Sequence, residues 1–391
     1  MKIISVIESI DDTYGGPASS LPNLLNALCE IEAVEADIYS VYRYEQEENH
    51  YIDKYGLNWI QSPQFGPNKL KISLTLFLKL FRNVKQGDVI YSNNLWNFCA
   101  LIPYLISRIK RVKHVVAIRG SLYDWSLSQG KIRKKIAWHC FQKKALDRAS
   151  LIHVTCDDEA IAVRKLGITA PLALVSHGID YCSFSTLPSV SISQKKLNLS
   201  ESKRYFLFMS RLHEKKGLDI LIDVWDKISK DHKDWCLLVA GPDYSDYATR
   251  LSHLADKIPG QVEYLGMLKG EERLSALSAS EFFVLPSYTE NFGVAIGEAL
   301  ASGLPVITTT GTPWSEINTI NCGFCIDLSS ENFEKALNNM LNSSEEELAI
   351  KSVKARELIK NNYSWDKQAK SFYSALSSLN TGVDAPCVYR K

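Results

Sequence analysis

Residues 282–308 read FFVLPSYTENFGVAIGEALASGLPVIT, in which an apolar run, a polar loop, a helical segment and a second apolar run follow one another. The first apolar run predicts a buried strand, and the loop after it carries Glu290. A helix is expected to begin near Gly293 and to end at Gly303, because glycine is common just after a helix. Strands without polar alternation are buried on both faces, which is typical of a parallel sheet in an α/β fold.

The same alternation continues along nearly all of the 391 residues. Because a single hydrophobic core stops growing near about 250–300 residues, this length predicts two domains. Each is expected to be a doubly wound, Rossmann-like parallel sheet, with ligands at the carboxyl ends of the strands, in a cleft where the domains face each other. The strands of the two sheets are expected at residues 3–7, 88–92, 114–118, 151–155 and 172–176, and at 205–209, 236–240, 262–265, 282–285 and 305–309.

A stretch rich in Ser, Lys and Asn, with little apolar periodicity, marks the expected boundary between the domains. We therefore expect an N-terminal domain over residues 1–185, a linker over 186–204 and a C-terminal domain over 205–364. The last helix, over residues 365–380, is expected to join the N-terminal domain.

Composition restricts the class of protein. Lys and Arg together number 45 against 44 Asp and Glu, so no overall positive field indicates a nucleic-acid partner. Nine scattered cysteines in a chain of this size indicate reduced thiols in a cytosolic compartment. The first residues lack the features of a signal peptide, and no apolar stretch is long enough to span a membrane. A cytoplasmic protein is expected, whose membrane contact, where there is any, is peripheral.

Two carboxylates flank the start of the helix near Gly293. Glu290 lies in the loop before it and Glu298 lies near its second turn. The unpaired N–H groups of a helix start attract an anion, and a carboxylate such as Glu298 accepts hydrogen bonds from a diol such as ribose. For a single pair of this kind, a loop charge and a solvated helix residue are the more common explanation.

Two other loops support a binding role. Strand 206–209 leads to a loop with Arg211 and Lys216 ahead of a helix, where cations are unfavourable unless an anionic ligand, such as a diphosphate, is present. The first strand leads to Gly15 and Gly16, which let the backbone approach a phosphate closely.

Together, these residues resemble those of glycosyltransferase family four, the retaining enzymes of the GT-B fold. The Glu-x7-Glu pattern, the Arg/Lys pair and the Gly-Gly loop occur in the family's order, and the resemblance covers nearly the whole chain. It implies a GT-B enzyme that moves a sugar from a nucleotide-diphosphate sugar to a saccharide or lipid-linked acceptor with retention of configuration. The type that it resembles takes part in bacterial polysaccharide, O-antigen and lipopolysaccharide biosynthesis.

The resemblance also implies roles for the residues of the donor site. Glu298 would bind the ribose hydroxyls of the nucleotide. Glu290 would bind the donor sugar, together with the backbone of Asn291, Phe292 and Gly293.

The diphosphate would be bound by Arg211 and Lys216, with Gly15 and Gly16 closing on it from the first domain. The Asp-x-Asp sequence that holds a divalent ion in metal-dependent sugar transferases is absent. We therefore expect no metal and no cofactor besides the nucleotide sugar as co-substrate.

The acceptor side departs from the family. Many relatives place a histidine at the end of a middle strand of the first domain, whereas residues 119–125 read RGSLYDW here. This resembles a subset of polysaccharide-assembly enzymes that read Arg-Gly-x-Leu-x-x-Trp, and it assigns Arg119 and Asp124 to the acceptor side. Arg119 either binds an acceptor phosphate or pairs with an acid.

A basic block occupies residues 131–148. Either it is a solvated helical face, or it binds an anionic membrane surface that carries a lipid-linked acceptor.

Two other functions compete with a glycosyltransferase. Another GT-B enzyme, such as a nucleotide-sugar epimerase, would need acid and base carboxylates in the cleft, and a periplasmic two-lobed binding protein would need a signal peptide.

Overall fold

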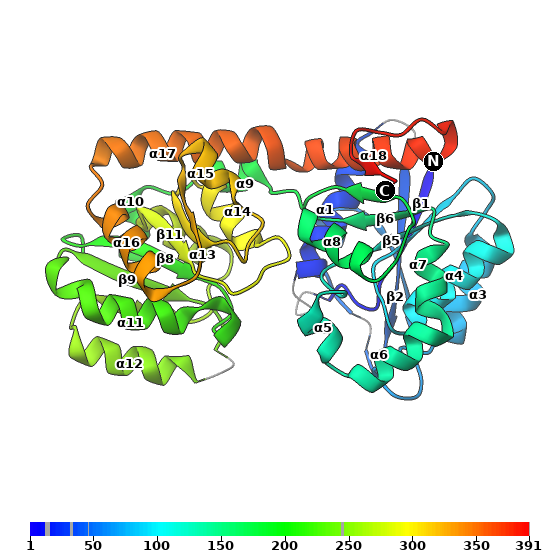
Figure 1. Ribbon diagram of the computed structural model, residues 1–391, viewed down its shortest axis with the longest axis horizontal. Coiled ribbons are helices and arrows are strands. Elements are labelled where there is room, and N and C mark those ends of the chain that lie inside the picture. Colours follow the sequence, from blue (N-terminus) through cyan, green and yellow to red (C-terminus); the bar gives the residue numbers. More distant parts are fainter. Residues whose placement is uncertain (12–15, 32–33, 46, 244–245, 391) are drawn as a thin grey trace. The chain divides into compact units, whose positions relative to one another are not determined.

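The computed structural model describes residues 1–11, 16–31, 34–45, 47–243 and 246–390. They divide into two compact units (Figure 1). Unit 1 contains Met1–Gly178 and Trp365–Lys391, and unit 2 contains Ile179–Ser364. Each unit has one twisted sheet with helices on both faces, which confirms the expected class of two doubly wound α/β sheets. None of the helices in the described ranges is long and apolar enough to span a membrane.

Unit 1 has a sheet in the order β14-β7-β6-β5-β4-β1-β2-β3, in which only β14 runs antiparallel to its neighbour. Its strands are β1 Lys2–Val6, β2 Glu35–Tyr42, β3 Asn58–Pro63, β4 Val89–Ser92, β5 Lys113–Ala117, β6 Leu151–Val154, β7 Leu172–Leu174 and β14 Val388–Tyr389. Its helices are α1 Gly16–Cys29, α2 His50–Tyr55, α3 Leu74–Asn83, α4 Phe98–Lys110, α5 Asp124–Ser128, α6 Lys131–Ala137, α7 Lys143–Asp147, α8 Asp157–Lys165 and α18 Trp365–Thr381.

Unit 2 has a sheet in the order β10-β9-β8-β11-β12-β13, and all of its pairings are parallel. Its strands are β8 Arg204–Met209, β9 Trp235–Ala240, β10 Val262–Tyr264, β11 Phe282–Leu285, β12 Val306–Thr309 and β13 Gly323–Ile326. Its helices are α9 Tyr181–Ser185, α10 Val190–Lys196, α11 Leu218–Ile228, α12 Tyr247–Lys257, α13 Gly270–Ala279, α14 Val294–Ala301, α15 Glu316–Ile320, α16 Ser330–Leu341 and α17 Glu345–Leu358.

Aromatic side chains fill the core of each unit. In unit 2, Phe206 of β8 stacks on Phe282 of β11 at 5.0 Å between ring centroids. In unit 1, Phe372 of α18 packs against Tyr91 and His153 of the sheet, at 5.1 and 4.8 Å. Burial of such large apolar surfaces provides most of the free energy that holds a helix against a sheet.

The prediction of an interdomain linker over residues 186–204 is wrong. Residues 186–204 contain α10, which packs against α13, and unit 2 already begins at Ile179. Ser278 Oγ donates a hydrogen bond to the Pro188 carbonyl oxygen at 2.6 Å. The buried residues of α10 are polar, Ser193 and Gln194, whereas apolar residues of the helix are exposed. This inverted polarity explains why the sequence shows no apolar periodicity there.

Each sheet has a point where the order of its strands reverses. In unit 1 this point lies between β1 and β4, and in unit 2 it lies between β8 and β11. The connections leave these neighbouring strands in opposite directions, so that an opening forms beyond their carboxyl ends. In unit 2, the loops that carry Lys216 and Glu290 follow the two strands at this point.

Candidate active site

The reversal point of unit 2 brings two of the predicted catalytic residues into contact. Lys216 follows β8 and Glu290 follows β11, and the Lys216 Nζ forms an ion pair with Glu290 Oε1. The same carboxylate oxygen accepts a hydrogen bond from Ser287 Oγ at 2.8 Å. The two charged side chains are only 14% and 12% exposed, so this pair is partly shielded from water.

A close approach of two backbone segments fixes this pair. Gly217 has a φ of +69°, and a Cβ atom there would lie 2.0 Å from the carbonyl oxygen of Pro286. Only glycine fits such a contact. Beside this contact, the Tyr288 N–H donates to the Lys215 carbonyl oxygen at 2.9 Å. The loops after β8 and β11 are therefore joined where Lys216 meets Glu290.

Three cations gather in the loop after β8. Burial lowers the pKa of Lys215, and the positive charges of Lys216 and Arg211 lower it further. Arg211 is exposed, and no carboxylate of the described residues forms an ion pair with it. An anion bound here would reduce the mutual repulsion of these charges. Lys215 was not predicted as a site residue, although the adjacent lysines in the sequence were a signal.

The predicted backbone site lies at the start of α14, whose N-cap Gly293 has a left-handed backbone with φ of +78°. Phe292 is buried, with its ring 5.0 Å from that of Trp314, and its carbonyl oxygen accepts a hydrogen bond from Trp314 Nε1 at 2.5 Å. Its side chain is therefore part of the core. Asn291 is partly exposed, and the Glu290 N–H donates to the Gly311 carbonyl oxygen at 2.8 Å.

Glu298 is more enclosed than a solvated helix residue. It is 8% exposed and forms an ion pair with Arg273 of α13. The guanidinium of Arg273 also lies 5.5 Å from the centroid of the Phe184 ring. Sequence reasoning missed Arg273, because the segment that carries it contains no recognised motif.

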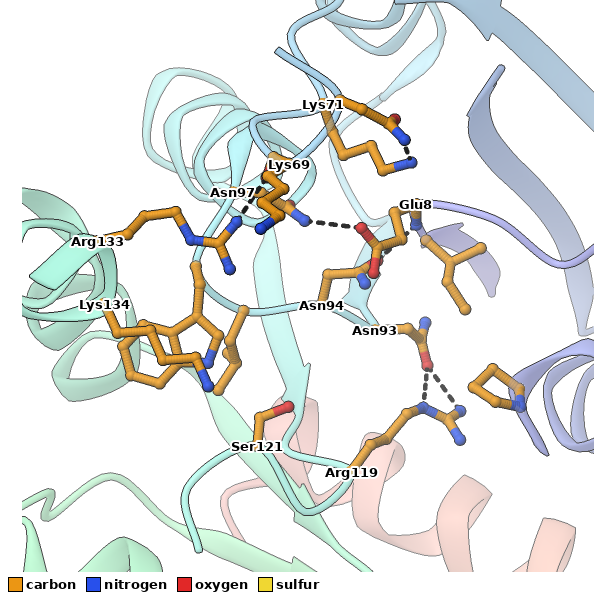
Figure 2. Close-up of a pocket in the computed structure, with 15 residues that line it drawn as sticks. Glu8, Lys69, Lys71, Asn93, Asn94, Asn97, Arg119, Ser121, Arg133 and Lys134 are labelled. Carbon is orange, nitrogen blue, oxygen red and sulfur yellow. Dashed lines mark hydrogen bonds between the residues drawn. The ribbon is translucent and has the colours of Figure 1, made fainter. Parts of the chain in front are cut away.

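Arg119, predicted on the acceptor side, follows β5 with a left-handed backbone (φ 47°). Its guanidinium donates to Asn93 Oδ1 at 3.1 Å from Nε and 2.8 Å from Nη2, and to Ser20 Oγ at 3.2 Å (Figure 2). No carboxylate of the described ranges forms an ion pair with it. The sequence left two alternatives for Arg119, an acceptor phosphate or an acidic partner. The acidic partner is not observed among the described residues.

A buried carboxylate holds the turn of Arg119 in place. Glu159 is fully buried, and its two oxygens accept hydrogen bonds from the backbone N–H groups of Gly120 and Thr155, the second at 2.7 Å. Burial raises the pKa of Glu159, and these hydrogen bonds act in the opposite direction. Such a network stabilises a backbone conformation that is otherwise rare for an arginine.

The other predicted residues of unit 1 do not join Arg119. Asp124 is an exposed carboxylate that pairs with Lys165 of α8 at 2.9 Å, and it does not line the pocket described below. Gly16 begins α1 in open space, because a Cβ atom added there would meet nothing of the described structure within 4 Å. Gly15 lies outside the described residues.

Unit 1 contains a pocket of about 440 Å³ beyond the carboxyl ends of β1, β4 and β5 (Figure 2). Arg119 lines it, and most of the other residues around it were not predicted. The unpredicted ones include the polar residues Glu8, Asn93, Asn94, Asn97 and Ser121, the indole of Trp96, and the cations Lys69 and Lys71. Arg133 and Lys134 also line the pocket, and they belong to the basic block expected over residues 131–148. The sequence signal was the polar run that directly follows β4.

Residues 190–365 match the family model of glycosyl transferases group 1. The match covers somewhat less than half of the chain and lies almost entirely in unit 2. The D-inositol 3-phosphate glycosyltransferase of Corynebacterium urealyticum is 25% identical over 268 residues, which are 65% of this chain and 63% of the relative. The lipopolysaccharide core biosynthesis mannosyltransferase LpsB of Rhizobium meliloti is 26% identical over 155 residues, 39% of this chain and 44% of the relative. The chain thus spans less than two thirds of the length of these curated relatives.

Solved structures extend the likeness of fold to nearly the whole chain. The crystal structure of Anabaena Alr3699/HepE in complex with UDP has a TM-score of 0.76 at 17% identity, covering 97% of this chain and 100% of that one. WaaG, a glycosyltransferase involved in lipopolysaccharide biosynthesis, has a TM-score of 0.70 at 16% identity, covering 95% and 99%. The expected GT-B fold agrees with these neighbours.

The matched segment contains one set of candidate site residues, and the other set lies outside it. Lys216, Glu290, Glu298 and Arg273 all lie within the matched residues 190–365, at the reversal point of the sheet or on the helices beside it. The pocket around Arg119 lies outside the match. The two units therefore offer two chemically different sites, and the family match bears on only one of them.

Proposed function

We propose that the protein transfers a sugar from a nucleotide-diphosphate sugar to a saccharide acceptor, and that the donor binds to unit 2. The observation that carries the proposal is the cluster of Arg211, Lys215 and Lys216 beside Glu290, at the reversal point of a group 1 domain. Its charge suits a diphosphate. The solved neighbour Alr3699/HepE has been crystallised with UDP and with UDP-glucose, which supports a donor of this class.

The reaction needs positive charge where the leaving diphosphate becomes more negative. Arg211 and Lys216 would provide it together with the N–H groups at the start of α14, without a metal ion. Lys216 would exchange part of its contact with Glu290 for the phosphate, which frees the carboxylate to accept hydrogen bonds from the donor sugar. Glu298 would bind the ribose while Arg273 keeps its carboxylate in place. The transferred sugar would keep its anomeric configuration, as the family resemblance implies.

The acceptor would be part of a bacterial surface polysaccharide, linked to a lipid at the cytoplasmic face of the membrane. The relatives LpsB and WaaG are named for lipopolysaccharide biosynthesis, which supports this class.

The structure of the basic block over residues 131–148 supports a peripheral contact with the membrane. On α6, Ile132 and Ile136 are 80% and 60% exposed, and they lie beside the exposed Lys131 and Lys135. Exposed apolar and basic residues together favour an anionic membrane surface.

The experiment that tests the donor is a thermal-shift screen with UDP, GDP and their sugar conjugates, followed by analysis of the products. One nucleotide should raise the melting temperature, because a ligand that binds only the folded state stabilises it. With acceptor extracts, the matching nucleotide sugar should release the nucleotide diphosphate. Conversion of the donor into an epimer without an acceptor would instead indicate an epimerase. Stabilisation by sugars alone, with no nucleotide effect, would indicate a binding protein.

A further inference from the structure

The pocket of unit 1 has a strong excess of positive charge. Five cationic side chains line it, from Lys69, Lys71, Arg119, Arg133 and Lys134, against the single carboxylate of Glu8. Figure 2 shows that they come from three directions: Arg133 and Lys134 from α6, the other two lysines from the loop before α3, and Arg119 from the end of β5. Glu8 can offset only one of these five charges, and its Oε2 also accepts a hydrogen bond from Asn97 Nδ2 at 3.0 Å.

Among the described residues, none of these five cations forms an ion pair with a carboxylate. Arg119 donates to the neutral side chains of Asn93 and Ser20, as described above. Lys134 donates to the Ser126 carbonyl oxygen, and its Nζ lies 5.6 Å from the centroid of the Trp96 ring. Burial lowers the pKa of Lys134, and the charge of Arg133 lowers it further. A bound anion would offset both effects.

A buried donor in the pocket wall has no partner among the described residues. Trp96 is 8% exposed, and its indole Nε1 makes no hydrogen bond in this part of the chain. The residue has a left-handed backbone (φ 74°), and its N–H donates to the buried Gln142 Oε1 at 2.9 Å. A buried donor without a partner and a strained backbone both cost free energy, so a position of this kind is typical of a ligand site.

The remaining polar groups suit the hydroxyl groups of a sugar. Asn94 Oδ1 accepts from the Glu8 N–H at 2.6 Å, which leaves its Nδ2 group without a partner among the described residues. Glu8 and Ser121 also line the pocket. Amide and carboxylate groups can donate to and accept from hydroxyls at the same time. A volume of about 440 Å³ lies in the range of small-ligand sites.

We propose that this pocket binds an anionic saccharide, whose phosphate or carboxylate contacts Arg119, Arg133 and Lys134 and whose hydroxyls contact Glu8 and Asn94. That this saccharide is the acceptor of the reaction rests on the proposed function. The binding itself does not, because the pocket lies in unit 1 and the donor residues lie in unit 2.

The test is calorimetric titration of the full chain with glucose 6-phosphate, glucuronate, methyl glucoside and inorganic phosphate. At least one of the two anionic sugars should bind about tenfold or more tightly than methyl glucoside, because hydrogen bonds to charged groups are the stronger ones. It should also bind more tightly than phosphate alone. The better of the two identifies the anionic group. Arg133→Gln should weaken that binding about tenfold, whereas the matched variant Arg108→Gln, on the exposed face of α4, should leave it unchanged.

Three results would overturn the proposal: equal binding of neutral and anionic sugars, phosphate binding as tight as that of the sugar phosphate, or an Arg133→Gln variant that binds like the parent. None of them bears on the donor site. Conversely, a chain that no nucleotide stabilises, but that binds an anionic sugar through Arg133, would refute the proposed function and leave this inference standing.

Discussion

Arg273 on α13 forms an ion pair with the buried carboxylate of Glu298 on α14. The sequence places Glu298 on a helix as a ribose-binding residue, and by that reasoning its removal should not affect the fold. The ion pair changes this expectation. The same carboxylate now holds two helices together and, by our proposal, binds the nucleotide.

We predict that Glu298→Ala lowers both nucleotide affinity and stability. Loss of a charged hydrogen-bond acceptor should cost about 1.5–3 kcal/mol of binding free energy to the matching nucleotide diphosphate, measured by calorimetry. Loss of the ion pair with Arg273 should lower the free energy of unfolding by about 1–3 kcal/mol, less than for a fully buried pair, because the side chain of Arg273 is 34% exposed. The double variant with Arg273→Ala should recover part of that stability but none of the affinity. Unchanged affinity with intact circular dichroism would remove Glu298 from the site.

Gly217→Ala should disturb the site through the backbone alone. The added Cβ would meet the Pro286 carbonyl oxygen and separate the two loops that bring Lys216 to Glu290. We expect a loss of well over 1 kcal/mol of stability together with reduced kcat, since alanine is also strained at positive φ. Gly260→Ala is the control, because Gly260 has a φ of +72° but nothing within 4 Å of its Cβ position. Equal effects of the two variants would show that strain at φ, and not the loop contact, is responsible.

The sequence predicts the central, buried strands of both sheets, and it misses two of the outer strands of unit 1. β9, with all six residues buried, and β11 fall within a residue of their expected bounds. β2 and β3 were missed, because they lie toward the edge of the sheet and contain polar residues that interrupt the apolar run. The linker was wrong for a related reason, since the buried face of α10 is polar.

The site follows the same logic. The positions of Lys216 and Glu290 in loops after buried strands were predictable from the sequence, whereas their roles stay a prediction. Their mutual contact and the pairing of Arg273 with Glu298 depend on how loops and helices far apart in sequence meet, which residue patterns do not encode. The cations of the unit 1 pocket come from three separate segments, and in the sequence two of them look like part of a basic helix.

Buried histidines should make the stability of unit 1 depend on pH. Burial lowers the pKa of His153 to about 4; the charge of Arg119 acts in the same direction, and a hydrogen bond to the Val175 carbonyl oxygen opposes it. Burial likewise lowers the pKa of His114 to about 4. The unfolded residues titrate near about 6.5, so between pH 6.5 and 4 the unfolded chain binds protons that the folded chain does not. Stability is therefore full above pH 6.5 and falls below it, by about 1.4 kcal/mol per pH unit for each histidine.

The measurement is urea unfolding, followed by circular dichroism, at several pH values from 7.5 to 4.5. His153→Gln should reduce the slope in the acid range, and His253→Gln, which changes an exposed histidine of unit 2, should not. If His153→Gln leaves the slope as it was, the buried ring does not control the pH dependence.

The exposed face of α6 should bind anionic membranes. The protein should sediment with anionic liposomes at low salt and be released as ionic strength rises, because each basic residue near the surface contributes about 1 kcal/mol. Reversing the charges in Lys131→Glu with Lys135→Glu should abolish this binding, and Ile132→Ser should weaken it at all salt concentrations. Lys230→Glu with Lys233→Glu, at two exposed lysines of unit 2, is the matched double reversal and should have no effect. Equal partitioning onto neutral liposomes, or none onto anionic ones, would make α6 a solvated face.

Lys216 should carry much of the charge stabilisation in catalysis. As the glycosidic bond stretches, the departing diphosphate gains negative charge, and Lys216 is a cation held in position by Glu290 and by the loop contact at Gly217. Lys216→Ala should lower kcat on the order of 10²–10³-fold, the scale of removing one preorganised charge-stabilising group. Lys216→Arg should not restore the rate, because a planar guanidinium replaces a compact ammonium in a partly buried pair. Lys230→Ala, at an exposed lysine of the same unit, controls for the loss of a charge.

Transfer should continue in EDTA, with the product in the donor's anomeric configuration by NMR. A rate abolished by EDTA and restored by magnesium would mean that a metal ion, and not Lys216, meets the leaving diphosphate.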